Sequence, residues 1–433
     1  MCSLLCLLPL AAGGQTTAPK VRTVLRHPGT SWGRMLWDGG MVRQKEGPWY
    51  LTLPDGYGDL IVMNFVDGYS YGPHAIIGYM TANRQRWEVE ETVRWASGRD
   101  RLLAKGALRW YSPVEQARMV EVHGGRHTED FDHDPTMPES QSLLATGLFG
   151  WNHYKLLERT DAGIRLALPL GNDLSMKASA SWERRRQQEN HRQTNVFGAH
   201  AQSNVPRLRD GNTASHLELY EGPIDGQIAL LGLQFDYRPQ SRYMVYDDMT
   251  CRASSRFPLF TLRADAGVGD WDYLSFDLRI SQTLALSRRQ DQLQYLASVG
   301  GMVRHGEVGL ADWHHFDASR FWWQASDCVS RFVMLDNYEL STDRAWVEAH
   351  AEWTTDRMLL SQLTRDASFL QEYVQVHAVQ VPQHRCHCEF AYGIDFARMI
   401  RLGFAVGFDR LTFRGAAFTL VIRPEEVARH SLL

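Results

Sequence analysis

The chain has 433 residues, of which 46 are Lys or Arg and 50 are Asp or Glu, giving a formal net charge of -4 at pH 7. This balance argues against a nucleic-acid partner, because such proteins present a strongly basic face to the phosphate backbone. Aromatic residues make up 11% of the chain, with 14 Trp and 16 Tyr. Trp and Tyr favour membrane interfaces, although they also fill soluble cores and line sugar-binding surfaces.

The amino terminus has the pattern of an export signal. An apolar run, residues 2–12, ends in the small residues Ala12, Gly13 and Gly14, which are typical of a cleavage site. We therefore predict that residues 1–14 are a signal peptide. No later apolar run approaches the roughly 18 residues of a membrane helix, so a membrane protein with this sequence would have to cross with strands.

The region before the first regular alternation is rich in Gly. It contains turn signals at 38–40 and 54–56, and we expect residues 15–72 to be a periplasmic lead-in. Residues 74–124 then alternate between apolar and polar positions, which predicts four strands with short connections.

The alternation stops between 124 and 161. Apolar residues at mixed spacing within 140–157 fit a helix, and we expect this stretch to be a long insertion that partly plugs the interior. Alternation resumes at 164–168 and 174–182, and the intervening Gly-Asn-Asp at 171–173 is typical of a tight hairpin.

The rest of the chain continues the strand pattern up to residue 422. Three closing strands are predicted within 385–422. The strands expected before them lie near 228–237, 258–267, 272–284, 292–303, 329–340, 344–354 and 372–380.

The closing strands show which side of the sheet is apolar. Ile400 and Phe404 share one face with other large apolar residues, while Arg401 and several glycines lie on the opposite face. A lipid-facing exterior around a polar lumen explains both faces. We predict an all-β fold, a closed antiparallel transmembrane β-barrel over 73–422, with about 16 strands and a range of 14 to 18, followed by a tail at 423–433.

Closure of the barrel requires the last strands to pair with the first. We expect one of the closing strands to pair with the strand near residues 74–80, which would leave no free edge.

Polar residues at inward positions are the candidate site. Charges that face a lumen pair with each other because an uncompensated buried charge is costly. No catalytic residue is predicted, although a hydrolase that acts through His350 is an alternative. The lumen-facing polar candidates are Asp277, Arg279, Glu348, His350, Glu352, Glu389, Asp395, Arg401 and Asp409.

Three clusters contain metal-ligand residue types. His123, His127 and His133, with nearby Asp residues, are candidate ligands for a divalent cation, and a solvated loop explains them as well. The same two interpretations apply to 312–317. At 383–389 the two cysteines are one residue apart, a poor match to structural zinc, and a hairpin with strand cysteines is favoured. We predict no cofactor and no metal.

Several segments together resemble a family of outer-membrane barrels from Bacteroidetes-type bacteria that is known only as a domain of unknown function. The resemblance implies an outer-membrane location and a barrel. It also implies a preceding carboxypeptidase-regulatory-like domain, which we expect to be missing because residues 20–72 are too short and irregular to hold it. The resemblance implies no biochemical activity for this chain, because the family has no agreed activity. The resemblance rests on Asn64-Phe65-Val66-Asp67-Gly68-Tyr69, Ser142-Leu143-Leu144, Asn152-His153-Tyr154-Lys155-Leu156, Trp182-Glu183-Arg184-Arg185 and Phe257-Pro258-Leu259-Phe260-Thr261-Leu262.

These observations favour a non-enzymatic integral outer-membrane barrel with a role in passive transport, envelope scaffolding or envelope assembly. Its expected partners are outer-membrane lipid and other envelope proteins. The alternative is a secreted soluble β-rich protein, either a hydrolase or a glycan binder that uses Trp313, Trp322 and Trp323.

Overall fold

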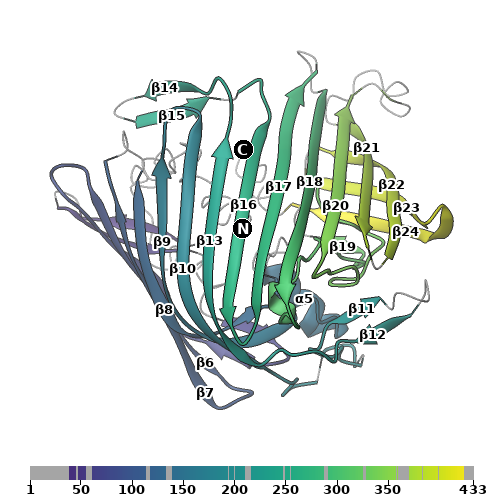
Figure 1. Ribbon diagram of the computed structural model, residues 1–433, viewed down its shortest axis with the longest axis horizontal. Helices are drawn as coiled ribbons and strands as arrows, with labels where there is room; N and C mark the ends of the chain where they lie inside the picture. Colours follow the sequence, from purple (N-terminus) through teal and green to yellow (C-terminus); the bar gives the residue numbers. More distant parts are fainter. Residues whose placement is uncertain are drawn as a thin grey trace.

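The polypeptide folds around one large, strongly curved sheet (Figure 1). This is a computed structural model. The structure describes residues 39–44, 47–54, 61–113, 118–132, 139–193, 195–198, 200–209, 216–246, 249–253, 255–286, 291–324, 328–356, 358, 370–382, 384–397 and 399–423.

The main sheet has 20 strands, and successive long strands are antiparallel neighbours. The long meander consists of β2 (Trp49–Leu53), β5 (His74–Met80), β6 (Arg86–Ala96), β7 (Arg101–Tyr111), β8 (Met119–Asp130), β9 (Leu156–Pro169), β10 (Leu174–Gln187), β13 (Gly226–Tyr237), β16 (Leu259–Gly269), β17 (Asp272–Ala285), β18 (Gln292–His305), β20 (Ala345–Thr355), β21 (Leu370–Val381), β22 (His384–Phe396), β23 (Ile400–Asp409) and β24 (Thr412–Ile422).

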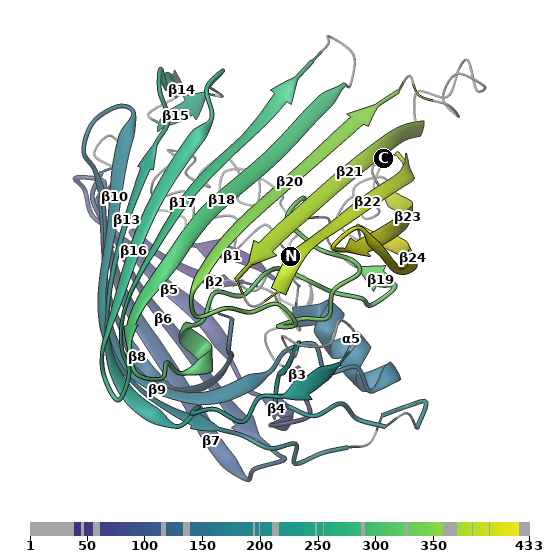
Figure 2. The same ribbon diagram turned by 45° about the vertical axis from the view of Figure 1, so that its right-hand side comes forward.

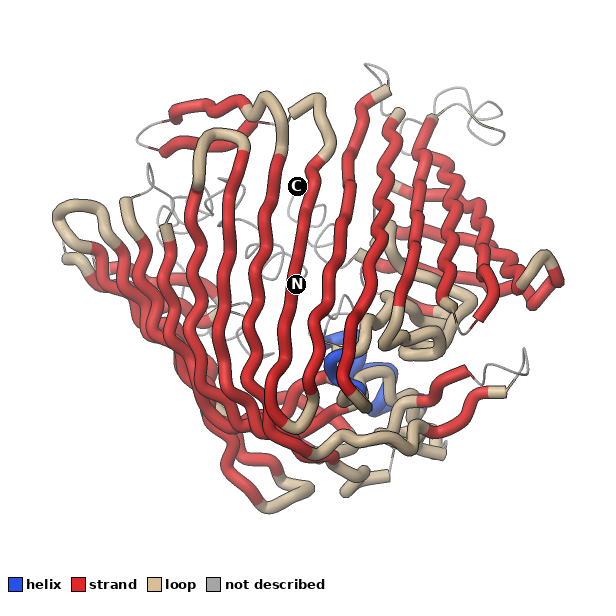
Figure 3. Tube along the Cα trace, viewed as in Figure 1, coloured by secondary structure: helices blue, strands red, loops and turns tan. Residues whose placement is uncertain are grey.

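Four very short strands extend this meander, and two small hairpins lie outside it. The short strands are β1 (Gly40–Arg43), β3 (Ile61–Asn64), β4 (Gly68–Tyr71) and β19 (Trp323–Gln324). The hairpins are β11 (Arg207–Arg209) with β12 (Leu217–Leu219), and β14 (Arg242–Tyr246) with β15 (Met249–Ala253). Strands account for most of the trace in Figure 3. Within the described residues, the helical elements are α5 (Glu139–Phe149) and the 3-10 turn η2 (Leu310–Asp312).

Most of the predicted strands are present. The four strands predicted over 74–124 are β5 to β8, and the three closing strands are β22 to β24. The strand predicted at 329–340 is wrong, because residues 328–340 form turns on the inner side of the sheet. Its apolar residues, such as Phe332 and Leu335, are buried in an irregular cluster, and hydrophobic spacing over a short run cannot distinguish such a cluster from a strand.

Two predicted boundaries need correction. The insertion placed at 124–161 spans only 131–155, because β8 and β9 remain paired up to Asp130 and Leu156. Both faces of this end of the hairpin are polar, so the alternation disappears while the backbone pairing continues. The helix expected within 140–157 is present as α5.

The predicted lead-in at 15–72 is also wrong in part. Residues 40–71 contribute β1 to β4 to the main sheet, and strands of four or five residues are too short to show a clear alternation. The predicted signal peptide at 1–14 and residues 424–433 of the predicted tail lie outside the described residues.

The two edges of the sheet are not joined in the described part of the chain. β24 pairs with β23 and, over two residues, with β19 in parallel. β5, the predicted partner of the closing strands, pairs with β2 and β6 instead, so that expected pairing is wrong. The sheet curves toward itself without closing (Figure 2).

The apolar face of the sheet is exposed and its charged face is buried, which is the reverse of the arrangement in a water-soluble sheet. On β20, Val347 and Trp353 are 51% and 43% exposed, whereas His350 on the opposite face is 2% exposed. On β23, Phe404 is 54% exposed and Arg401 is 4% exposed. Large apolar side chains therefore cover the outer face, and charged side chains are buried on the inner face. A water-soluble sheet would bury the apolar face.

Among the described residues, no helix is both long and apolar enough to cross a membrane.

Candidate functional site inside the curved sheet

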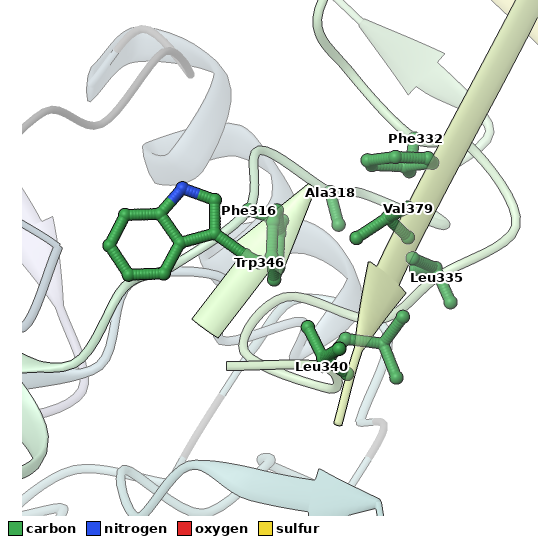
Figure 4. Close-up of a cluster of buried hydrophobic side chains, with 8 residues drawn as sticks. Phe316, Ala318, Phe332, Leu335, Leu340, Trp346 and Val379 are labelled. Carbon is green, nitrogen blue, oxygen red and sulfur yellow. The ribbon is translucent and has the colours of Figure 1, made fainter. Parts of the chain in front are cut away.

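The interior of the curve contains the long connection between β18 and β20, residues 306–344, which we call the inner connection. Its apolar side chains, including Phe316, Phe332 and Leu335, pack with Trp346 of β20 and Val379 of β21 (Figure 4). All of these residues are nearly completely buried. The inner connection therefore has its own apolar core against the inner face of the sheet.

Carboxylates fix the inner connection to the last strands of the sheet. Glu389 of β22 accepts hydrogen bonds from the backbone nitrogens of Val333 and Met334, at 2.8 and 2.9 Å. Glu339 of the connection accepts hydrogen bonds from Arg414 of β24 at 2.8 Å and also pairs with Arg209. These charge-assisted bonds are stronger than neutral ones, so this side of the connection is tightly held.

A second set of contacts fixes the other side of the inner connection. Asp312 receives two hydrogen bonds from the Arg185 guanidinium, at 2.6 and 3.0 Å, and one from the Tyr273 hydroxyl at 2.9 Å. Tyr338 donates a hydrogen bond to Asp130 at the end of β8. The inner connection thus bridges β8, β10 and β17 to β22 and β24 across the interior.

Three imidazoles surround Phe332 of the inner connection. The ring centroids of His350, His377 and His387 lie 4.9, 5.8 and 6.0 Å from that of Phe332. His350 Nδ1 lies 2.9 Å from His377 Nδ1, and His350 Nε2 lies 3.4 Å from Glu348. Both ring nitrogens of His350 therefore already have structural partners.

The third imidazole lies between two carboxylates. His387 Nε2 is 2.9 Å from Glu389, and its Nδ1 is 2.6 Å from Asp409. Asp409 also accepts a hydrogen bond from Arg209 at 2.8 Å. This chain of contacts connects the His387 imidazole to the carboxylate of Glu389, which holds the inner connection.

A separate network lies toward the other end of the same strands. Arg401 makes two hydrogen bonds to Glu352, at 2.8 and 3.0 Å, and packs over the Tyr373 ring at 4.1 Å. Asp395 lies 3.4 Å from Arg401 Nε and accepts a hydrogen bond from Arg423 at 3.0 Å. The paired geometry offsets the cost of burying these charges.

The predicted polar residues do not all share one location. Six of them, Glu348, His350, Glu352, Glu389, Asp395 and Arg401, are buried on the inner face of the last strands, and Asp409 borders them. On β17, Asp277 lies 3.4 Å from the Trp346 indole nitrogen, and Arg279 on the same face is exposed.

Several residues of the network were missed by the sequence prediction. His377, Arg185, Glu339, Arg209 and Arg414 all contribute contacts. For His377, the alternation of β21 with Tyr373 and Gln375 on the same face was a usable signal. The other contacts depend on the path of the inner connection, which has no periodic pattern.

Two of the candidate metal ligands lie near the same carboxylate. His123 and His127 both approach Asp161, at 3.6 and 3.5 Å, and His133 lies outside the described residues. Across the described part of the chain, no group of three or more potential ligands has a geometry suited to a metal ion. Cys386 and Cys388 are free thiols with their sulfurs 3.3 Å apart.

His314 and His315 are packed against neighbouring side chains of the fold. His314 stacks on Trp346 with centroids 4.0 Å apart, and His315 Nδ1 lies 2.8 Å from the Ser341 hydroxyl. Burial lowers the pKa of His314 to about 4 and that of His315 to about 3. Both imidazoles are therefore neutral near pH 7, and they belong to the packed core of the inner connection.

The reversed polarity and the long antiparallel meander define an all-β protein whose large sheet is apolar on its outer face and charged on its inner face. Residues 33–394 match the family described as "Family of unknown function (DUF5686) C-terminal domain". The chain therefore belongs to this family, which confirms the predicted resemblance to a domain family of unknown function. A search of curated proteins found no match.

Three solved structures are similar to this chain in the arrangement of their strands. BamA from Haemophilus ducreyi lacking POTRA domains 1–3 has a TM-score of 0.44 and 11% identity, with 94% of this chain and 81% of that chain covered. CdiB from Acinetobacter baumannii has a TM-score of 0.36 and 11% identity, with 88% and 58% covered. A Rhodopseudomonas blastica porin variant has a TM-score of 0.32 and 10% identity, with 81% and 89% covered.

Proposed function

We propose that this protein is a non-enzymatic, integral outer-membrane β-barrel whose lumen is occupied by its own inner connection, and that it serves in envelope scaffolding or assembly. The observation that supports this proposal is the set of contacts between the inner connection and both sides of the sheet. Asp312 and Tyr338 fix one side, and Glu339 and Glu389 the other.

The membrane location is supported by the outer face of the sheet. Apolar side chains such as Val347 and Phe404 are exposed there, while the opposite face carries buried ion pairs. Such a face is stable in lipid and unfavourable in water. In the membrane the sheet would be a closed barrel, because an open edge exposes backbone groups that lipid cannot satisfy.

The edge of β24 favours assembly over passive transport. Only Leu420 and Val421 of this strand are paired with β19, through a parallel bridge of two residues. A sheet edge is a template for strand addition, and closure of the barrel in the membrane would pair this edge with a strand of this chain or of another envelope protein. Passive transport is less favoured because the inner connection crosses the interior.

Conductance in a planar bilayer tests the occupied lumen. We expect the purified protein to show little or no steady current, because the inner connection blocks the passage. The double variant Glu339→Gln with Glu389→Gln removes carboxylate acceptors on one side of the connection, and we expect it to show frequent openings. Glu218→Gln, at an exposed site on β12, is the matched control and should remain closed.

A large steady current through the unaltered protein would disprove the occupied lumen and favour a transport role. Heat-modifiable migration of the detergent-extracted protein tests the membrane barrel separately. Recovery of the folded protein in the aqueous phase without detergent would instead support a secreted soluble protein.

A further inference from the structure

A cavity of about 560 Å³ lies where three long connections meet, residues 131–155, 188–225 and 306–344. These connections follow β8, β10 and β18, and the antiparallel meander places all three at the same end of the sheet. In outer-membrane barrels the longer connections face outward from the cell. If the proposed membrane orientation holds, the cavity opens to the exterior.

Side-chain amides dominate the wall of this cavity. Each amide offers both donors and acceptors, so together they suit a ligand that has many groups of both kinds. Six of the amide residues are Asn152, Gln188, Asn190, Gln202, Asn204 and Asn337.

The wall is held in place by its own hydrogen bonds. The Asn204 amide donates to the backbone oxygens of Leu156 and Gln188, both at 2.7 Å, and accepts from the Leu156 nitrogen at 2.8 Å. The Lys155 ammonium donates to the carbonyl oxygens of Asn152 and Ser203, both at 2.7 Å. These contacts are made without a ligand, so the shape of the wall is pre-organised.

One polar atom of the wall has an unused hydrogen-bonding capacity. Asn190 donates to the backbone oxygen of Gln202 at 2.8 Å, but its Oδ1 is enclosed and has no hydrogen-bond partner in the described part of the chain. An enclosed acceptor without a partner is costly. A ligand hydroxyl group would satisfy it once the Asn190 side chain turns its Oδ1 toward the cavity.

The charges of the cavity largely offset each other. Arg320 faces Asp336 at 3.4 Å, and the wall also contains Lys155, Arg207 and Glu189. Burial lowers the pKa of Lys155 to about 7, which further reduces the positive charge. The wall therefore has no strong preference for an anionic ligand.

An aromatic surface completes the cavity. Trp151 lines the wall, and its ring packs against Phe321 with centroids 5.7 Å apart. A fixed indole gives a flat apolar surface next to polar groups. Sugar rings have this same combination, because their C–H faces are apolar and their edges carry hydroxyl groups.

We propose that this cavity binds a neutral saccharide, with Trp151 against the apolar face of a sugar ring and the amides of Asn190 and its neighbours on the hydroxyl groups. The volume lies within the range of about 300–1,000 Å³ that is usual for small-molecule sites. This site is separate from the inner network of β20 to β24. Its wall includes Arg320 and Asn337 of the inner connection, so it requires that connection to be in place.

The test uses the full chain in lauryldimethylamine oxide, because sugar-based detergents would compete for the cavity. We expect binding to neutral oligosaccharides on a printed array of neutral and acidic glycans. Titration with the best neutral glycan should give affinities at least tenfold weaker for Asn190→Ala and for Trp151→Ala. Asn172→Ala, in the turn between β9 and β10 at the other end of the sheet, should bind as the unaltered protein does.

Three results would overturn the proposal: no binding to any glycan on the array, a preference for acidic glycans, or unchanged affinity in both cavity variants. Heat-modifiable migration of each variant shows whether it is folded. The conductance experiment measures current through the lumen and the glycan titration measures binding in this cavity, so failure of saccharide binding in a protein that remains closed is distinguishable from failure of the proposed scaffold role.

Discussion

At the scale of single residues, close packing between Tyr373 and two glycines shapes the inner face of the last strands. Gly393 and Gly403 are directly paired on β22 and β23, and a Cβ at either position would overlap the Tyr373 hydroxyl. The ring of Tyr373 in turn supports Arg401 at 4.1 Å. The glycines are therefore required for space, since neither has a positive φ.

We predict that Gly403→Ala destabilises the protein by about 1–3 kcal/mol, because it overpacks a closed site. The added methyl group would meet Tyr373 and come within 2.6 Å of the Thr419 hydroxyl. Denaturation in detergent measures the effect. Gly301→Ala on β18 is the control, because its nearest contact would be 3.5 Å away. Equal stability of the two variants would contradict this explanation.

At the scale of elements, the inner connection is a packed unit whose buried histidines make it sensitive to acid. Burial lowers the pKa of His315 to about 3 from its usual 6.5. The unfolded chain therefore binds a proton in the range between these values while the folded chain does not. Stability rises with pH across that range and is lost as the pH falls below about 6.5.

We predict that His315→Gln makes the protein less sensitive to acid. In the unaltered protein, His315 alone accounts for a loss of about 2 kcal/mol between pH 7.5 and pH 5.0. Urea denaturation at the two pH values measures the free energy of unfolding. The exposed His305 at the end of β18 provides the control His305→Gln, which should retain the full loss. If His315→Gln also retained it, the buried neutral imidazole would not be its source.

At the scale of the whole molecule, the apolar outer face distinguishes a membrane protein from a soluble one. Phe404 is 54% exposed in the middle of β23, and Leu411 is 95% exposed in the turn between β23 and β24. The first position would lie in the hydrocarbon region of a bilayer. The second would lie at the end of the barrel, outside the hydrocarbon.

We predict that Phe404→Arg destabilises the lipid-inserted protein by about 2–4 kcal/mol, which is the usual cost of a cation on the lipid face near the midplane. Leu411→Arg should have little effect. Reversible unfolding from vesicles of phosphatidylcholine measures both. A soluble protein would tolerate Phe404→Arg as well as Leu411→Arg, so equal behaviour of the two variants would contradict the membrane assignment.

The sequence by itself determined most of the long strands and their two faces. Alternation with a period of two is a local property, so it predicted β20 and β23 with His350 and Arg401 on the inner side, and the structure buries both residues. Local pattern was also sufficient to predict the helix α5.

Only the tertiary structure decided what fills the interior and which groups meet there. The apolar residues of the inner connection have no regular spacing along most of its length. Over residues 329–340 their spacing predicted a strand, but the structure has turns there. Contacts such as Arg185 with Asp312 or Glu389 with Val333 join residues that are far apart in the chain. The amide-lined cavity is formed by three separate connections. Periodicity describes neighbours along one strand, whereas these sites depend on how irregular segments pack together.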